Sequence, residues 1–218
     1  MRPLLMVATP GEAQHLRGLG VSVRVSGIGA VNAALATADA VREERPDLVV
    51  SVGIGGAYPS SGLTFGDVAF SSEMIYATLG AMGGEGGQEF LDLAALGFEL
   101  VDGLHNRLPA WDGAREWTRR AQGVLGEVNA RAVLGPILTV DTVTGTASGA
   151  DILERRFPGA LVEGMEGSAV AHAARRLGVP ALEIRSVSNP VGPRDRAAWR
   201  ISEALTSLTV ALQTVLRN

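Results

Sequence analysis

Four polar side chains that could take part in acid–base chemistry stand close together in the last third of the sequence. Glu166 lies at the start of a predicted helix, and Arg185 lies within an apolar stretch, residues 181–187, that predicts a strand. Ser188 and Asn189 follow this strand directly, before a proline. Because open α/β sheets bind ligands at the carboxyl ends of their strands, we expect these side chains at one site.

Glu12 is a further candidate acid, near the N-terminus. It follows a predicted buried strand, residues 3–9, and lies in the first turn of a helix that begins with Pro10. An acid there complements the helix dipole, a contribution of ~0.3–1 kcal/mol. A carboxylate at a strand end is also placed to work as a general base. The local pattern leaves both roles open.

The elements that must position these residues alternate between strand and helix. The alternation, without a linker or repeat, predicts one α/β domain over residues 1–218 with a largely buried sheet. We expect strands at residues 3–9, 21–26, 47–52, 66–70, 132–140, 159–162 and 181–187, and helices from residue 10 and at 30–44, 111–125, 150–157, 164–178 and 197–216. Pro136 predicts an irregular or edge position in its strand. The glycine-rich stretch at residues 79–88 predicts a mobile surface loop that could cover a site.

Two glycine clusters follow predicted strands. Gly27-Ile28-Gly29 precedes an alanine-rich helix but lacks the third glycine of a dinucleotide fingerprint, so close packing of strand and helix is favoured. Gly53-Ile54-Gly55-Gly56 follows the strand at residues 47–52. Such a cluster either exposes backbone N–H groups to a ligand or forms a tight turn, and the pattern does not decide between them.

Composition excludes several kinds of site. The formal net charge of −4 argues against a nucleic-acid surface. All 19 basic residues are arginine and there is no cysteine, which excludes lysine Schiff bases, thiolate catalysis and disulfides. His15, His105 and His172 lack metal-ligand spacing, so neither metal nor cofactor is expected. Without a signal peptide or an apolar run of ~18 residues, a soluble cytoplasmic protein is predicted, with no membrane partner.

The run GMEGSAVAHAARRLGVP followed by EIRSVSN resembles the signature of the nucleoside phosphorylase/hydrolase superfamily, and most closely its nucleosidase branch. Within that branch, SNPVGPRDRAAWRI is similar to the futalosine hydrolase family of menaquinone biosynthesis. The broad resemblance covers nearly the whole chain. It implies a mixed, twisted central sheet flanked by helices, a small nucleoside as substrate, and a homo-oligomer.

The resemblance also implies roles for particular residues. Met165 would pack against the ribose, Glu166 would accept its hydroxyl hydrogen bonds, and Glu12 would activate the water. Arg185 matches the motif arginine near the water, and Gly53, Ile54 and Gly55 match the glycine-rich segment beside the sugar. Val143 and Thr144 match the purine contacts. Ser188 matches the strand-end serine, and Trp199 matches an aromatic residue at the site.

Two departures from the adenine-specific relatives bear on the base. Those relatives have a second glutamate at the position of Gly164 and an aspartate at that of Asn189. An amide offers both a donor and an acceptor, which suits a 6-oxopurine such as hypoxanthine. Phosphorylase relatives also carry a phosphate-binding arginine in the first loop, and residues 9–12 contain none. Together these features favour hydrolysis of futalosine to hypoxanthine.

Other interpretations stay open. The chain could be another purine nucleosidase or phosphorylase, acting for example on inosine or methylthioadenosine, or a nucleoside-binding module without activity. Glu166 alone could be a helix N-terminal acid, and Arg185 alone an ion-pair partner. His172 is predicted to pack among alanines. Arg194 and Arg196, in the run PRDR, either are solvated or receive the acidic tail of futalosine.

Overall fold

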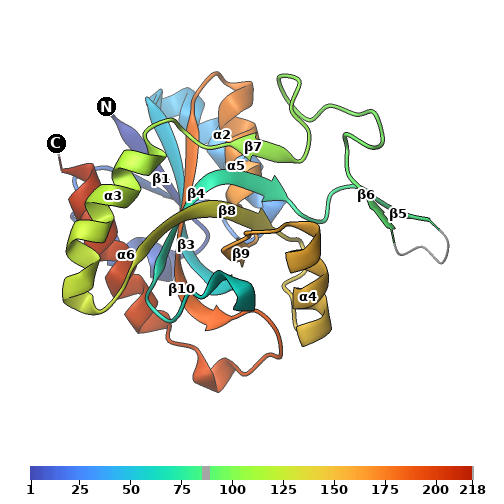
Figure 1. The fold of residues 1–218 in the computed structure, drawn as a ribbon. Helices are drawn as coiled ribbons and strands as arrows, with labels where there is room; N and C mark the ends of the chain where they lie inside the picture. Colours follow the sequence, from blue (N-terminus) through green and yellow to red (C-terminus); the bar gives the residue numbers. More distant parts are fainter. Residues whose placement is uncertain (85–88, 218) are drawn as a thin grey trace.

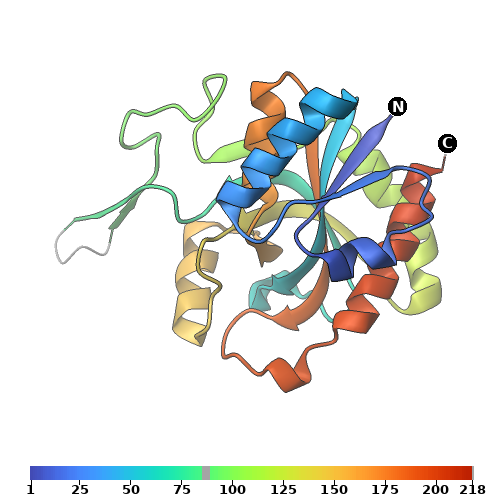
Figure 2. The same ribbon diagram turned by 180° about the vertical axis from the view of Figure 1, so that it is seen from behind.

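A computed structural model of the chain describes residues 1–84 and 89–217 (Figures 1 and 2). Its strands are β1 (Pro3–Val7), β2 (Ser22–Val25), β3 (Leu48–Ala57), β4 (Val68–Tyr76), β5 (Ala81–Gly83), β6 (Glu89–Leu91), β7 (Arg107–Pro109), β8 (Ala132–Thr139), β9 (Val162–Gly164) and β10 (Ala181–Pro190). Its helices are α1 (Pro10–His15), α2 (Ala30–Glu44), α3 (Ala114–Leu125), α4 (Ala147–Arg156), α5 (Gly167–Arg176) and α6 (Ile201–Leu216). Short 3₁₀ turns lie at Pro59–Ser61, Gly126–Val128 and Arg196–Ala198.

The central sheet is mixed and partly closed on itself. Strand β3 pairs in parallel with β10, which pairs antiparallel with β4; β4 and β8 are parallel, as are β8 and β9. Strand β9 returns to β3 in antiparallel pairing, which closes the ring. Strands β1 and β2 extend the sheet in parallel from the other half of β3. The mixed sheet that the resemblance implies is therefore confirmed.

One edge of β3 changes partner halfway along, and this change creates an opening in the sheet. Strand β1 pairs with β3 from Leu48 to Ser51, whereas β9 pairs with the same edge only at Gly56 and Ala57. Strand β10 occupies the other edge over the whole distance, from Val49 to Ala57. Residues 52–55 consequently lack a strand partner on the first edge within the described chain, and their backbone groups there are free for side chains.

Helices cover both faces of the sheet, as the two views show (Figures 1 and 2). Strand β1 shows the period-two pattern expected of a buried strand. Leu5 packs in a cluster with Trp117 of α3 and Leu208 of α6. Leu4, the next residue along, packs in a different cluster with Ala33 of α2 and Ala171 of α5. The alanines of α5 allow α2 and α5 to pack closely over this second face.

Most predicted elements are confirmed, with shifts at their ends. The helix predicted at residues 30–44 is α2, and the others begin or end within a few residues of expectation. Pro136 lies inside the sheet in β8, opposite a register shift between Ser71 and Glu73 of β4, so the irregular position is confirmed. Part of the loop predicted at residues 79–88 is strand β5, which pairs with β6 just beyond that range, and residues 85–88 lie outside the described residues.

Two predicted strand ends are wrong in an instructive way. Strand β3 continues through the cluster from Gly53 to Gly56, which is neither loop nor turn, because the parallel partner β10 binds its backbone throughout. Strand β10 likewise continues to Pro190, past a bulge between Val187 and Asn189. The glycines and the Ser-Asn pair are thus held in a sheet, which fixes their positions more firmly than a loop would.

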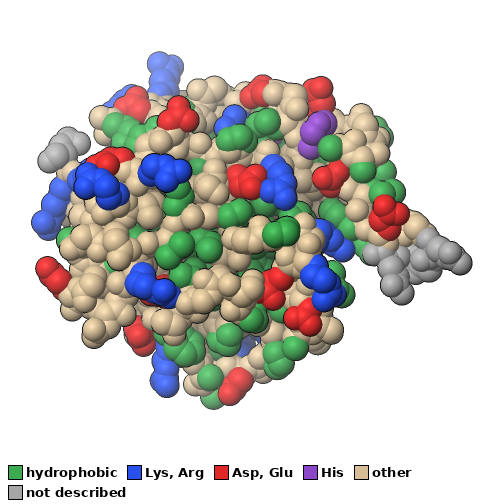
Figure 3. All heavy atoms as spheres, in the orientation of Figure 1, with side chains coloured by type: hydrophobic (Ala, Val, Ile, Leu, Met, Phe, Trp, Pro, Cys, Tyr) green, Lys and Arg blue, Asp and Glu red, His purple; other side chains and the backbone are tan. Residues whose placement is uncertain are grey.

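On the face shown in Figure 3, arginine and acidic side chains are interspersed, and neither sign forms a continuous field. Among the described residues, no helix has the length and apolar character needed to cross a bilayer.

Candidate active site

A cavity of about 620 Å³ opens where β3 lacks its strand partner. This volume lies in the range usual for small-molecule sites. The predicted residues that line it are Glu12, Ile54, Gly55, Val143, Thr144, Met165, Glu166, Arg185, Ser188, Asn189, Arg194 and Trp199. Gly53 and Arg196 do not line it. Gly53 is covered because an added Cβ would lie 2.6 Å from Glu12 Oε1 and 2.7 Å from an Arg185 nitrogen.

Glu12 is both an acid in the first turn of α1 and a carboxylate that faces the cavity, which are the two positions that its sequence left open. Thr9 caps α1, and its backbone N–H and hydroxyl donate to Glu12 Oε2 at 3.0 and 2.8 Å. The other oxygen, Oε1, accepts the N–H of Ile54 at 3.2 Å, across the opening in the sheet. Glu12 is buried at 7% exposure yet lines the cavity. The capping box therefore orients a carboxylate that remains open to a water in the cavity.

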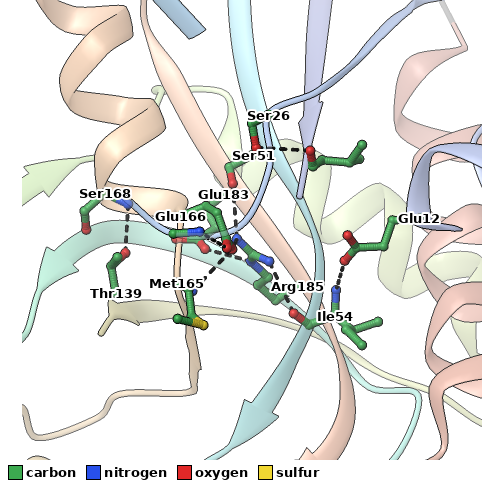
Figure 4. A network of polar contacts seen from close by, with 12 residues as sticks. Glu12, Ser26, Ser51, Ile54, Thr139, Met165, Glu166, Ser168, Glu183 and Arg185 are labelled. Atoms are coloured by element: carbon green, nitrogen blue, oxygen red, sulfur yellow. Dashed lines mark hydrogen bonds and ion pairs between the residues drawn. The ribbon is translucent and has the colours of Figure 1, made fainter. Parts of the chain in front are cut away.

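Arg185 is the centre of a buried polar network (Figure 4). Its guanidinium donates to Glu183 Oε1 at 2.8 Å and to Glu166 Oε2 at 3.2 Å, and Nη1 donates to the carbonyl of Ile54 at 3.3 Å. Burial by itself would lower the pKa of Arg185, but the charges of Glu183, Glu166 and Glu12 outweigh it and raise the pKa. Ile54 thus links the network to Glu12, since its N–H and C=O bind the two side chains.

Glu166 occupies the N-cap position of α5, one residue before the helix begins. Its Oε1 accepts the backbone N–H of Gly29 at 3.0 Å, and Oε2 accepts from Arg185. Gly29 has φ 89°, a left-handed conformation that favours glycine. The ion pair with Arg185 is therefore present, whereas the carboxylate makes no capping hydrogen bond to α5, and Glu166 lines the cavity beside Met165.

Glu183 is a member of this network that sequence reasoning missed. It lies on β10 two residues before Arg185, is fully buried, and one of its oxygens has no hydrogen-bond partner among the described residues. Burial raises the pKa of Glu183. A Cβ on Gly167 would overlap this carboxyl group, so the first residue of α5 must be glycine while Glu183 is present. An acid in an apolar strand two residues from an arginine was the available signal.

A second polar group lies farther along β3. Gly56 pairs with Asn189 of β10 on one side and with Glu163 of β9 on the other, which places the three residues in one cross-strand row. The Asn189 amide accepts from Ser188 Oγ at 2.9 Å and donates to the carbonyl of Pro190 at 2.9 Å. One amide hydrogen and one lone pair of Asn189 remain for a ligand.

Glu163 lines the cavity, and sequence reasoning did not single it out. Its Oε2 accepts the Tyr58 hydroxyl at 2.8 Å and the Thr144 hydroxyl at 2.7 Å, and Oε1 accepts the Thr144 N–H at 2.8 Å. Burial, followed by the charge of Glu163, raises the pKa of Tyr58, which therefore stays a donor. No sequence signal marked Glu163, because only the pairing of β9 with β3 brings it beside Asn189.

The mouth of the cavity is cationic and aromatic. The guanidinium of Arg194 lies 5.7 Å from the ring centroid of Trp199, and that of Arg196 lies 5.8 Å from it. Both arginines are exposed, but only Arg194 lines the cavity. His172 packs edge-on against Tyr76 away from the cavity, in line with its predicted packing role.

Within residues 1–84 and 89–217, no three His, Asp or Glu side chains are grouped as metal ligands would be. The arginines that line the cavity are Arg185 and Arg194. Arg185 is already bound to Glu183 and Glu166, which leaves it poorly placed to hold a free phosphate. The site is thus acidic, with three carboxylates lining it, from Glu12, Glu163 and Glu166.

Comparison with known structures agrees with this fold. A 5'-methylthioadenosine/S-adenosylhomocysteine nucleosidase of Colwellia psychrerythraea, solved in complex with adenine, superposes with a TM-score of 0.82 at 26% identity, covering 99% of this chain and 94% of its own. The corresponding nucleosidase of Neisseria meningitidis, solved with methylthio-immucillin-A, gives 0.83 at 23% identity over 98% and 97% of the chains, which bears on the fold alone.

Comparison of sequences is more specific. Futalosine hydrolase of Streptomyces coelicolor is 44% identical over 211 residues, covering 94% of this chain and 83% of the relative. Futalosine hydrolase of Thermus thermophilus is 36% identical over 205 residues, covering 92% and 83%. The profile of the Phosphorylase superfamily matches residues 9–217. With this match over nearly its whole length, the chain belongs to the Phosphorylase superfamily.

Proposed function

We propose that this protein hydrolyses the N-glycosidic bond of futalosine and releases hypoxanthine, a step of menaquinone biosynthesis. The main support is the meeting of Glu12, Glu166, Arg185 and Asn189 in one cavity, in a chain 44% identical to a futalosine hydrolase. Adenine-directed nucleosidases are more distant, at 27% identity for that of Oceanobacillus iheyensis. Asn189 also departs from the aspartate of the adenine-specific motif.

The chain supplies the groups that the reaction requires. Glu12, with Oε2 committed to Thr9, uses Oε1 to take a proton from water as the water oxygen attacks the anomeric carbon. The bond from that carbon to the base breaks, and its electron pair leaves with the base. Positive charge develops on the sugar, and the carboxylates of Glu12 and Glu166 stabilise it. Asn189 holds the departing base while the ring nitrogen takes up a proton from solvent, and Glu12 then returns to solvent the proton that it took from water.

Arg185 is assigned to positioning. It connects Glu166 with the Ile54 carbonyl, and the Ile54 N–H in turn holds Glu12. Glu166 is thereby left with a free lone pair on Oε1 for a ribose hydroxyl, after Gly29 has taken the other. The Arg185 guanidinium and the Ile54 peptide unit thus fix the positions of Glu12 and Glu166 relative to each other.

The acidic tail of futalosine is assigned to the mouth of the cavity. Arg194 lines the cavity next to Trp199, which is placed to contact an aromatic ring. Guanidinium groups bind planar carboxylates in bidentate fashion. Arg196 does not line the cavity, but its guanidinium also lies near the Trp199 ring and adds positive charge to the mouth of the cavity.

Product analysis with three nucleosides tests the proposal. Purified protein is incubated with futalosine, inosine or methylthioadenosine, with and without phosphate, before and after treatment with a chelator. We expect hypoxanthine and the free sugar from futalosine, at a rate independent of phosphate and chelator. A sugar 1-phosphate as product would make the protein a phosphorylase. Preferential cleavage of methylthioadenosine would return it to the adenine-directed nucleosidases.

We also propose that the chain self-associates. An exposed apolar stripe consists of Ile28, which precedes α2, and Val31 and Leu35, which lie on α2 at helical spacing. Their exposed fractions are 60%, 74% and 64%. Ile28 also lines the cavity, so a second copy on this stripe would lie near the site. Light scattering should give an oligomer for the natural protein and a smaller species for Val31→Glu. A monomeric natural protein would contradict the proposal.

A further inference from the structure

Glu163 is a buried carboxylate in the cavity that the mechanism above does not use. It is 5% exposed and receives three hydrogen bonds, two at Oε2 and one at Oε1. A carboxylate has about four acceptor positions. Both positions of Oε2 are filled by Tyr58 and Thr144, which leaves one acceptor position at Oε1. The side chain is therefore immobilised by three donors and offers the cavity a single acceptor.

The position of Glu163 along β3 separates it from the groups that act on the sugar. Glu12 and Arg185 crowd Gly53, whereas Glu163 and Asn189 flank Gly56. Three residues of strand span about 10 Å. A Cβ on Gly56 would lie 3.1 Å from Asn189 Nδ2, a close contact, and 3.8 Å from Glu163 Cγ, an ordinary one, so both side chains approach this residue. The two groups thus line one cavity beside different residues of β3, as the sugar and the base occupy different parts of a nucleoside.

The hydrogen-bonding pattern of this second group matches one class of base. A 6-oxopurine presents the O6 acceptor next to the N1–H donor, whereas adenine presents an N6 donor next to the N1 acceptor. Asn189 has a free amide hydrogen, and Glu163 has only acceptors. The Thr144 N–H, which would suit adenine N1, is already bound by Glu163 Oε1.

We infer that Glu163 selects the base, by accepting the N1–H of a 6-oxopurine at Oε1 while Asn189 donates to its oxygen or ring nitrogen. Tyr58 and Thr144 are positioning residues that keep the carboxylate in place. This inference rests on the proposed function for the identity of the substrate, and it adds that two side chains from two different strands, not Asn189 alone, read the base.

Binding of free bases tests the inference without the reaction. Hypoxanthine, adenine and 1-methylhypoxanthine are titrated calorimetrically into the natural protein and into Glu163→Ala and Glu163→Gln. The natural protein should bind hypoxanthine about 10²-fold more tightly than 1-methylhypoxanthine, because the methyl group removes the donor to a charged acceptor. Equal binding of these two bases would overturn the inference, and this comparison needs no variant to fold.

The two variants should behave differently. In Glu163→Ala the Thr144 N–H is freed and faces the base, so the hypoxanthine-to-adenine affinity ratio should fall about 10²-fold or more. In Glu163→Gln the same N–H holds the amide oxygen at the Oε1 position, so the preference for hypoxanthine should persist with at most about tenfold loss. If Ala weakens both bases equally, Glu163 is only structural.

The outcomes also separate this inference from the proposed function. If the natural protein fails to hydrolyse futalosine but binds hypoxanthine in preference to the other two bases, the proposed substrate is wrong and the role of Glu163 stands. If futalosine is hydrolysed and the affinity ratio is the same in Glu163→Ala as in the natural protein, the proposed substrate stands and the role of Glu163 is refuted.

Discussion

Replacement of Glu12 by glutamine separates its two roles. In the structure Oε2 accepts from Thr9 and Oε1 accepts from the Ile54 N–H. An amide nitrogen at either position would face a backbone N–H, so Glu12→Gln loses one of these bonds whichever way the amide turns. Loss of an N-terminal capping interaction costs about 0.5–2 kcal/mol of stability.

Loss of the base should have a larger and different effect. General acid–base groups contribute about 10²–10⁴ in rate. At 1.36 kcal/mol per tenfold change, this corresponds to about 3–5 kcal/mol in the activation barrier. We therefore expect Glu12→Gln to remain folded, to bind hypoxanthine, and to release it from futalosine with kcat reduced by about 10²–10⁴.

Thr9→Ala is the matched control, because it removes the capping hydroxyl and keeps the carboxylate. Its stability should fall by about 1 kcal/mol, with kcat lowered less than tenfold. Thermal unfolding and hypoxanthine release are measured on both variants. The assignment of Glu12 as base is refuted if Glu12→Gln retains a rate near that of the natural protein, or if the two variants lose the same activity.

Four further predictions concern the base, the tail and the buried network. Asn189→Asp should lose most futalosine hydrolysis and gain detectable cleavage of an adenine nucleoside; an unchanged ratio of kcat/KM for the two substrates would show that Asn189 does not read the base. Replacing Arg194 and Arg196 together by Ala should raise KM for futalosine much more than for inosine, whereas equal effects would leave them as solvated side chains. Gly167→Ala should lower stability by about 1–3 kcal/mol through overlap with Glu183. Burial raises the pKa of Glu183, so the folded state holds its proton above the unfolded-state pKa and natural stability declines as pH rises through that interval. In Glu183→Gln this decline should disappear. The check is the difference between the melting temperatures at pH 5 and at pH 8, measured for the natural protein and for the variant. An equal difference in both proteins would contradict the direction of the pKa shift.

Local pattern was enough to predict most of the elements, and the family resemblance singled out the candidate acids. Helix α2 was predicted at its observed bounds, because an alanine-rich run ending in charged residues is a local property. Glu12, Glu166 and Arg185 were recognised because they match positions of the family motif, and because Glu12 and Glu166 follow predicted strands whereas Arg185 is a charged residue within one. Their side chains do line one cavity.

Pairing of distant strands decided the rest. Whether Gly53 to Gly56 formed a turn or a strand depended on β10, which joins β3 from residues more than a hundred positions later. The neighbours of Gly56 came from β9 and β10 together, so Glu163 gave no signal in the linear sequence.

The sequence by itself was enough to predict the fold class, the family and the acids that the proposed function assigns to the sugar. The fold class follows from the alternation of elements along the chain, and the family and the acids follow from motifs that resemble it. Only the tertiary structure decided which carboxylate stands beside Asn189, which one is buried against Gly167, and where the sheet opens. The physical reason is that β3 exchanges β1 for β9 along one edge, and the exposed backbone of Ile54 then binds Glu12 and Arg185.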